Sequence, residues 1–180
     1  MRKIALVLML IGIMALPSFA QGTWSVGAGL AGGSPMGDFG NVAKLGMGGV
    51  VWGAYNLDQN LTLTGKIGYL SFSGKDVTIG PYTYTYEATT IMPILVGGKY
   101  FFMPPGDMRA YGALELGMYN INVAGIGSAT KVGFAPSVGG QYKIADKMNL
   151  DLNINYTYIS TDNTSSTYLG FALGVEYALQ

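Results

Sequence analysis

The sequence predicts an all-β fold, an eight-stranded antiparallel up-and-down barrel, and three observations support this prediction. Apolar and polar residues alternate with period two over long stretches, as expected for strands with two different faces. Eight such stretches follow one another along the chain. The connections between them alternate between long and short, as expected when successive connections lie at opposite ends of the sheet.

Residues 1–20 are expected to form a signal peptide and are excluded from the fold prediction. Basic residues open this segment, and an apolar run of 13 residues follows at 4–16. Because that run is shorter than a membrane-spanning helix, a signal peptide cleaved near Ala20 is favoured over a membrane anchor. Residues 21–180 are expected to form a single barrel domain.

The strands are expected, in chain order, at 23–31, 45–57, 61–73, 91–102, 108–121, 132–144, 150–158 and 168–179. The clearest is 150–158, where every even position is apolar or aromatic and every odd position is polar. In 45–57 the pattern leaves open whether Val51 or Trp52 faces outward.

The connections divide into two sets. Short connections rich in Asp, Asn, Pro and Gly, which are turn residues, are expected at 58–60, 103–107 and 145–148. Long connections are expected at 32–44, 74–88, 122–130 and 160–166.

Alternation alone does not show which face meets water, so composition has to decide. Only 11% of the residues are charged, against about 25% in an average soluble domain. The polar face is rich in small residues, which suit the crowded interior of a barrel with eight strands. Aromatic residues gather near strand ends, as two interfacial belts would require. The sequence therefore predicts a transmembrane barrel, and a secreted or periplasmic soluble barrel that binds an apolar ligand remains the alternative.

Each expected belt has its own residues. The belt at the short-turn end comprises Trp24, Tyr55, Tyr100, Phe102, Tyr142 and Tyr177. The belt at the long-loop end comprises Tyr69, Phe72, Tyr156 and Tyr158.

Charges within the strands are few and balanced, which suits a closed interior where each charge needs a partner. The expected interior network consists of Lys66, Lys99, Glu115, Lys143, Asp151 and Glu176. Lys66 and Glu115 are expected to lie deeper than the other four, which should contact one another near the short turns. Since a charge facing lipid is costly, Glu115 must point inward, and Tyr111 and Tyr119 then point inward with it.

The 74–88 connection contains an alternating Tyr-Thr run in which Tyr82, Tyr84 and Tyr86 share one face. This run is in phase with the outward residues of the next strand, so a hairpin that turns at Gly80-Pro81 and protrudes past the membrane is expected. A protruding edge can bind an extended partner by strand addition. The alternative is that the tyrosines only extend the outer belt.

Several activities are disfavoured by the residues that the chain lacks. It has no histidine and no cysteine, so the commonest general base and the commonest metal ligands are missing, and no catalysis is expected. The glycines of Gly27-x-Gly29-x-x-Gly32 lack the helix start that a dinucleotide site needs, so no cofactor is expected. A net charge of zero gives no reason to expect nucleic acid as a partner. A narrow channel remains an alternative function.

The glycine-rich segment from Gly27 onward, followed by Pro35-Met36-Gly37-Asp38-Phe39, resembles the small eight-stranded outer-membrane barrels typified by OmpX and the OmpA barrel. The resemblance implies a bacterial outer-membrane location, with short turns in the periplasm and long loops outside. It also implies contact with outer-membrane lipid and lipopolysaccharide, and with the barrel-insertion machinery during assembly. The implied role is structural or a surface interaction with an extracellular protein or other surface partner.

Overall fold

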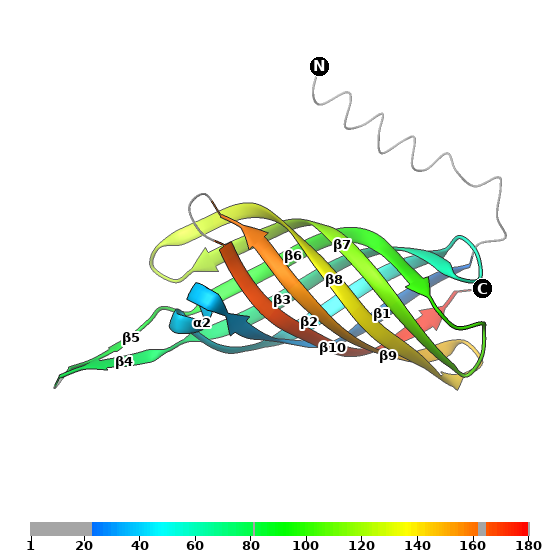
Figure 1. Cartoon of the computed structure of the whole chain (residues 1–180), viewed down its shortest axis with the longest axis horizontal. Helices are drawn as coiled ribbons and strands as arrows, with labels where there is room; N and C mark the ends of the chain where they lie inside the picture. The colour runs from blue at the N-terminus through cyan, green and yellow to red at the C-terminus, as the bar shows by residue number, and fades with distance from the viewer. Residues whose placement is uncertain (1–22, 81, 162–164, 180) are drawn as a thin grey trace, which may run out of the picture.

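The computed structural model describes residues 23–80, 82–161 and 165–179 of the 180-residue chain, so the predicted signal peptide lies outside the described residues. The elements in order are β1 (Trp24–Met36), α2 (Gly37–Val42), β2 (Ala43–Asn56), β3 (Leu61–Gly74), β4 (Asp76–Ile79), β5 (Tyr82–Thr85), β6 (Thr89–Phe101), β7 (Met108–Val123), β8 (Gly127–Ala145), β9 (Met148–Ser160) and β10 (Ser165–Ala178). Eight of these strands close into an antiparallel barrel in the order β1-β10-β9-β8-β7-β6-β3-β2 (Figure 1). The predicted fold is confirmed.

The barrel is sealed where the first strand meets the last. β1 pairs with β10 in unbroken register from Ser25 opposite Ala178 to Met36 opposite Thr167. Closure of this kind leaves no sheet edge inside hydrocarbon, where unpaired backbone groups would find no hydrogen-bond partner.

Two prolines interrupt the ladders elsewhere. Between β3 and β6, pairing stops after Ile67 opposite Ile94 and resumes at Leu70 opposite Ile91, and Pro93 lies in the gap. Pro136 lies in a similar gap between β8 and β9. Because proline has no backbone N–H, it cannot donate to the ladder at these positions.

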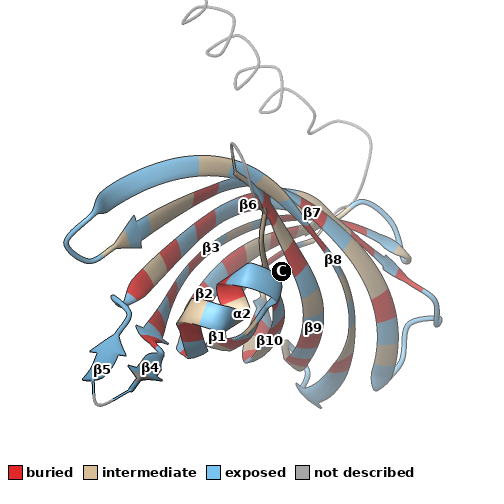
Figure 2. Ribbon diagram, turned by 60° about the vertical axis from the view of Figure 1, so that its left-hand side comes forward, coloured by how far each residue is buried: buried red, intermediate tan, exposed pale blue. Residues whose placement is uncertain are grey.

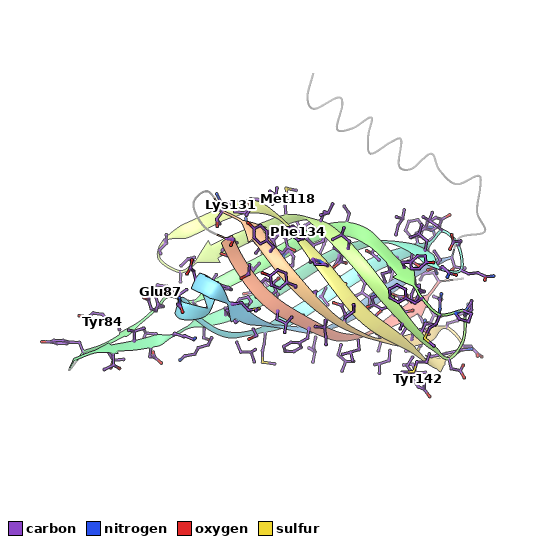
Figure 3. All side chains as sticks on the ribbon, in the orientation of Figure 1. Tyr84, Glu87, Met118, Lys131, Phe134 and Tyr142 are labelled. Atoms are coloured by element: carbon purple, nitrogen blue, oxygen red, sulfur yellow. The ribbon has the colours of Figure 1, made fainter. Side chains whose placement is uncertain are left out.

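The two faces of the barrel wall have opposite chemistry. Buried and exposed residues alternate along the strands, as the bands in Figure 2 show. Val51 is 54% exposed and Trp52 only 8%, so Val51 faces outward. Large apolar side chains, including the labelled Met118 and Phe134, point away from the barrel (Figure 3). Soluble monomers rarely expose an apolar patch above a few hundred Å². The wall is therefore inverted relative to a soluble barrel, and that alternative is set aside.

Two of the segments that were predicted to be long connections consist mostly of regular secondary structure, so these two predictions are wrong. β1 continues to Met36 and α2 follows at once, so little of 32–44 is loop. β7 and β8 extend to Val123 and from Gly127, which reduces 122–130 to a tight turn with Gly125 at φ 72°. Beyond the membrane both faces of a strand meet water, so the alternation that marks a strand in lipid fades before the pairing does.

The predicted hairpin in 74–88 is present. β4 and β5 pair antiparallel, from Asp76 opposite Thr85 to Ile79 opposite Tyr82, and form a separate two-stranded sheet. This sheet projects beyond the end of the barrel (Figure 1). Pro81, in the expected turn, lies outside the described residues.

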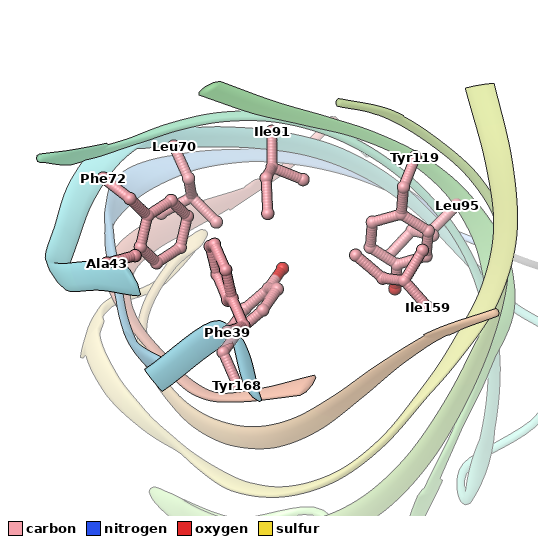
Figure 4. Packing of buried hydrophobic residues seen from close by; sticks show 9 residues of the cluster. All are labelled: Phe39, Ala43, Leu70, Phe72, Ile91, Leu95, Tyr119, Ile159 and Tyr168. Atoms are coloured by element: carbon pink, nitrogen blue, oxygen red, sulfur yellow. The ribbon is translucent and has the colours of Figure 1, made fainter. Parts of the chain in front are cut away.

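An apolar cluster fills the loop end of the barrel beneath α2 (Figure 4). The Phe39 ring of α2 lies 5.1 Å from the Phe72 ring, which in turn lies 5.6 Å from Tyr168. The prediction that Phe72 belongs to the outer belt is wrong, because its side chain is fully buried in phase with the inward residues of β3.

Within the described residues, no helix has the length and apolar character needed to cross a membrane.

Candidate functional site

Lys99 of β6 forms the centre of a buried polar cluster inside the barrel. Its Nζ lies 2.9 Å from Oδ2 of Asp151 and 3.7 Å from Oε2 of Glu176. The ammonium also stands 4.7 Å from the centre of the Tyr111 ring and 5.9 Å from that of Trp52. The structure therefore brings these three predicted residues together, with aromatic faces that supply further favourable electrostatics.

Neutral hydrogen-bond donors complete the shells of both carboxylates. Asp151 accepts from the Tyr111 hydroxyl at 2.7 Å and from Gln141 Nε2 at 3.0 Å. Glu176 accepts from Ser25 Oγ at 3.1 Å and from Trp52 Nε1 at 2.7 Å. These donors allow two carboxylates to share one lysine in a buried site. The sequence prediction did not include these donors in the network, although the inward phase of Ser25, Tyr111 and Gln141 was a usable signal; the direction of Trp52 was open.

Lys66 and Glu115 form a second, separate ion pair. Lys66 Nζ lies 2.6 Å from Glu115 Oε2, and both side chains are largely buried. The two clusters together draw on every strand of the barrel wall. Their members are Ser25 on β1, Trp52 on β2, Lys66 on β3, Lys99 on β6, Tyr111 and Glu115 on β7, Gln141 on β8, Asp151 on β9 and Glu176 on β10.

Lys143 is not a member of this network, and its predicted place in it is wrong. Its Nζ lies 3.3 Å from Oδ1 of Asp146 in the adjoining turn, and its side chain is 43% exposed. Lys143 has the inward phase of Gln141, but it lies near the end of β8, beside an irregularity in the β8–β9 register. At this position near the β8–β9 turn, the long side chain of Lys143 reaches water and does not reach the buried carboxylates.

A chain of hydrogen bonds follows the inner face of β9. Thr157 Oγ1 donates to Asn155 Oδ1 at 2.9 Å, and Asn155 Nδ2 donates to Asn153 Oδ1 at 3.2 Å. Asn153 Nδ2 then donates to the Tyr111 hydroxyl at 3.4 Å, which itself donates to Asp151. All four donors point toward the carboxylate, so the chain stabilises its negative charge.

Little space remains inside the barrel. One cavity of about 50 Å³ lies between the Lys66–Glu115 pair and Tyr168, and a second of about 20 Å³ lies between the two ion-pair clusters. Among the residues that the structure describes, no group of three potential ligands could hold a metal ion. Polar side chains at the turn end and apolar side chains at the loop end therefore fill most of the interior between the described strands.

The β4–β5 hairpin is the second candidate site. Tyr82, Tyr84 and Tyr86 are 67%, 60% and 47% exposed, and Val77 stands opposite Tyr84 on the same face. The label in Figure 3 places Tyr84 on the hairpin, past the end of the barrel. On the other face, the hydroxyls of Thr78 and Thr83 lie 3.2 Å apart. The hairpin thus has an aromatic face and a hydroxyl face.

The base of the hairpin is anchored to the barrel. Asp76 Oδ2 accepts from Lys44 Nζ on β2 at 2.9 Å, and Asp76 Oδ1 accepts from Thr85 Oγ1 at 2.7 Å. The hydrogen bond and charge of Lys44 and the Thr85 hydrogen bond hold the pKa of Asp76 below its ordinary value. The backbone N–H of Lys75 donates to Val42 O at 2.8 Å. These contacts hold the projecting sheet in a defined position.

Comparisons with known proteins give a consistent result. A family model described as the outer membrane protein beta-barrel domain matches residues 4–178. The fold is similar to that of Neisserial surface protein A, at 17% identity over 88% of this chain and 99% of that one, with a TM-score of 0.68. It is also similar to OprG from Pseudomonas aeruginosa, at 13% identity over 88% and 96%, with a TM-score of 0.64.

A third similar structure is Ail of Yersinia pestis in complex with the heparin analogue sucrose octasulfate. It is 18% identical over 89% of this chain and 100% of that one, with a TM-score of 0.59. No curated protein matches the chain in sequence. The three structural likenesses establish the barrel fold, and the family model establishes the relationship.

Proposed function

The chain belongs to the outer membrane protein β-barrel domain family, and on that premise we propose that it is a non-catalytic surface-interaction barrel. The family is one of bacterial outer-membrane barrels, and the apolar outer wall of this chain suits contact with lipid and lipopolysaccharide. In this proposal the tight turns face the periplasm and the β4–β5 hairpin faces the surroundings of the cell. The hairpin is the binding site, and its partner is an extended segment of another protein.

Export and assembly form part of the same proposal. Residues 1–20 act as a signal peptide cleaved near Ala20, and the barrel-insertion machinery then inserts 21–180. N-terminal sequencing of the protein purified from outer membranes tests this step. A mature N-terminus at Gln21 supports it, and a protein that retains residues 1–20 contradicts it.

The observation that supports the binding role is the free edge of β5. Within the described residues, β4 and β5 pair only with each other. Because Tyr86 N donates to Lys75 O, the alternation of an antiparallel ladder turns the backbone groups of Thr83 and Thr85 away from β4. These groups are available to a third strand, and a two-stranded hairpin gains stability when one is added.

The side chains of β5 leave this edge open. Natural edge strands are usually blocked by lysine, proline or a bulge, whereas Tyr82–Thr85 contains only tyrosine and threonine, which favour strand structure. The tyrosines offer rigid, amphipathic contact area to every second residue of an added strand. Backbone pairing supplies affinity in this arrangement, and the tyrosine face supplies selectivity.

The hairpin base is poorly suited to a sulfated ligand of the kind in the Ail complex. Lys44 is paired with Asp76, and Lys75 Nζ donates to Gly40 O. Asp76 neutralises Lys44, so Lys75 alone gives the base a net positive charge, whereas a multiply sulfated saccharide needs several cations. A peptide strand therefore fits the hairpin better than a sulfated saccharide.

The experiment that tests this function is Thr83→Pro, with Thr83→Ser as the matched control. Proline removes an outward backbone N–H and the Thr83 hydroxyl, which lies 3.2 Å from that of Thr78, and leaves the backbone hydrogen bonds between β4 and β5 intact. Cells carrying each variant are compared with cells lacking the protein for attachment to one another. We expect wild-type and Thr83→Ser cells to attach and Thr83→Pro cells to lose attachment. Equal attachment by cells with and without the protein would contradict the binding role and leave the membrane fold unaffected.

A narrow path for small solutes is the second candidate function. The gap in the β3–β6 ladder at Pro93 lies beside the 50 Å³ cavity, which Pro93 and Gly68 help to line. Because β3 and β6 lack ladder hydrogen bonds at this level of the barrel, they can separate there more easily than at other levels. Uptake of small apolar and small polar solutes into vesicles, compared between wild type and Pro93→Val, tests this path. Uptake equal to that of empty vesicles would exclude it.

A further inference from the structure

The 20 Å³ cavity lies between the two buried ion pairs of the barrel interior. Its lining includes both members of the Lys66–Glu115 pair and both members of the Lys99–Asp151 pair, together with Thr64. These pairs contribute two positive and two negative charges, and Glu176, whose Oε2 lies 3.7 Å from Lys99 Nζ, adds one more negative charge beside the lining. A lone cation would lie beside both lysines and a lone anion beside both carboxylates, so an occupant that is both a donor and an acceptor suits this lining better than an ion.

Hydrogen-bonding groups around this cavity have unused capacity. Thr64 is 6% exposed, and its hydroxyl has no hydrogen-bond partner among the described residues. The pair with Lys66 engages Oε2 of Glu115 and leaves Oε1 as a further acceptor. Lys99 can donate three hydrogen bonds, and one of them is made to Asp151. Donors and acceptors of this kind around a buried space are costly to leave unsatisfied.

We infer that this cavity is a binding site for one water molecule, which joins the two ion pairs into a single network. A buried water needs roughly 10–15 Å³ and two to four polar partners, and the cavity offers both. Water can accept from Thr64 or Lys99 and donate to Glu115, whereas a bare cation could accept no hydrogen bond. The occupant is therefore neutral, both a donor and an acceptor, and the size of one water.

This site has an energetic consequence that the direct contacts do not predict. No hydrogen bond or ion pair among the described residues links Lys66 or Glu115 directly to Lys99 or Asp151. If the pairs were independent, the effects of changing them would add. A shared water makes them interdependent, and Thr64 is the residue that positions it.

The direct test is a high-resolution crystal structure of the purified barrel grown in sodium and in rubidium salts. We expect an ordered peak within hydrogen-bond distance of Thr64 Oγ1 that is unchanged between the two salts. A cavity without density would overturn the inference, and so would a peak that gains anomalous signal from rubidium.

The energetic test is a double-mutant cycle between Glu115→Gln and Asp151→Asn, measured as shifts in the unfolding midpoint. We expect the double variant to shift by clearly less or more than the sum of the single variants. The same cycle in a Thr64→Val background should become additive, and in Thr64→Ser, which keeps the hydroxyl, it should stay non-additive. Additive shifts in the wild-type background would contradict the shared water.

Discussion

Toward the tight turns the barrel is filled by ion pairs around Lys99, whereas toward α2 and the β4–β5 hairpin it is filled by aromatic rings around Phe72. Both halves lie inside the same closed wall, and both leave little space. The polar half holds its strands together through directional bonds between charges and donors on strands that are not neighbours in the barrel wall. The apolar half relies on the packing of α2 into the mouth of the barrel. Stability should therefore depend on charge in the first half and on volume in the second.

The largest effect is expected from Lys99→Met, which keeps most of the side-chain volume and removes the charge. Asp151 and Glu176 would remain buried without the cation they share. We expect the free energy of unfolding to fall by about 4 kcal/mol, the usual cost of removing one partner from a buried pair. Equilibrium urea unfolding of the barrel in lipid vesicles measures this.

Lys143→Met is the matched control for that variant. Its partner Asp146 is fully exposed, so the change should cost less than about 1 kcal/mol. Equal losses in the two variants would show that charge has no special weight in the polar half.

The second prediction tests the apolar half with Phe72→Ala and Phe72→Leu. Phe72 is fully buried between Phe39 and Tyr168, so truncation to alanine leaves a large void. We expect a loss of about 3 kcal/mol for alanine and less than about 1.5 kcal/mol for leucine, which refills much of the space. Urea unfolding again supplies the free energies, and similar losses for both variants would contradict a response set by volume.

The third prediction is a change at constant volume in the polar half, Asp151→Asn. Asparagine keeps the shape of the side chain but loses the charge that Lys99 and Tyr111 contact. Because Glu176 still partners Lys99, we expect a loss of about 2 kcal/mol, smaller than for Lys99→Met. Urea unfolding again measures the free energy. An unchanged free energy of unfolding would contradict the claim that stability depends on charge in the polar half.

The smallest effect is expected at the hairpin, where the Lys44–Asp76 pair is 50% exposed on each side. The pKa of Asp76 is lowered in the folded protein, so its stabilisation of the hairpin base is present above the ordinary aspartate pKa. That stabilisation is lost as the pH falls below about 4, through the lowered folded pKa. As the pH falls through this range, amide hydrogen exchange of Val77 and Tyr84, corrected for intrinsic rates, should become faster in the wild-type protein. In the Asp76→Asn variant, which lacks the titrating group, it should change less. An equal response of both proteins would contradict the assignment.

The strands in the membrane could be predicted because lipid imposes strict alternation. The inward phase of Lys66, Lys99 and Glu115 followed from the same rule, since a charge cannot face lipid without a high cost. The extensions of β7 and β8 could not be predicted, because alternation weakens where both faces meet water. The sequence also could not reveal α2, a short helix held in place by the packing of Phe39.

Phase alone was insufficient at two other positions. The prediction for Phe72 rests on its type, an aromatic residue near a strand end, although its phase points inward. Lys143 has the inward phase, but its height near the turn and its reach to Asp146 depend on local register. Membership of a buried network therefore requires depth along the strand as well as phase, and depth comes only from the closed barrel.

The most direct test of the central claim, a closed barrel in the outer membrane, is heat-modifiability on a gel of washed outer membranes. A tightly closed barrel resists SDS until it is boiled and then changes its apparent mass. We expect a membrane-bound band that shifts on boiling, and a shift at lower temperature for Lys99→Met. A protein recovered in the soluble periplasmic fraction, with one band before and after boiling, would contradict the account.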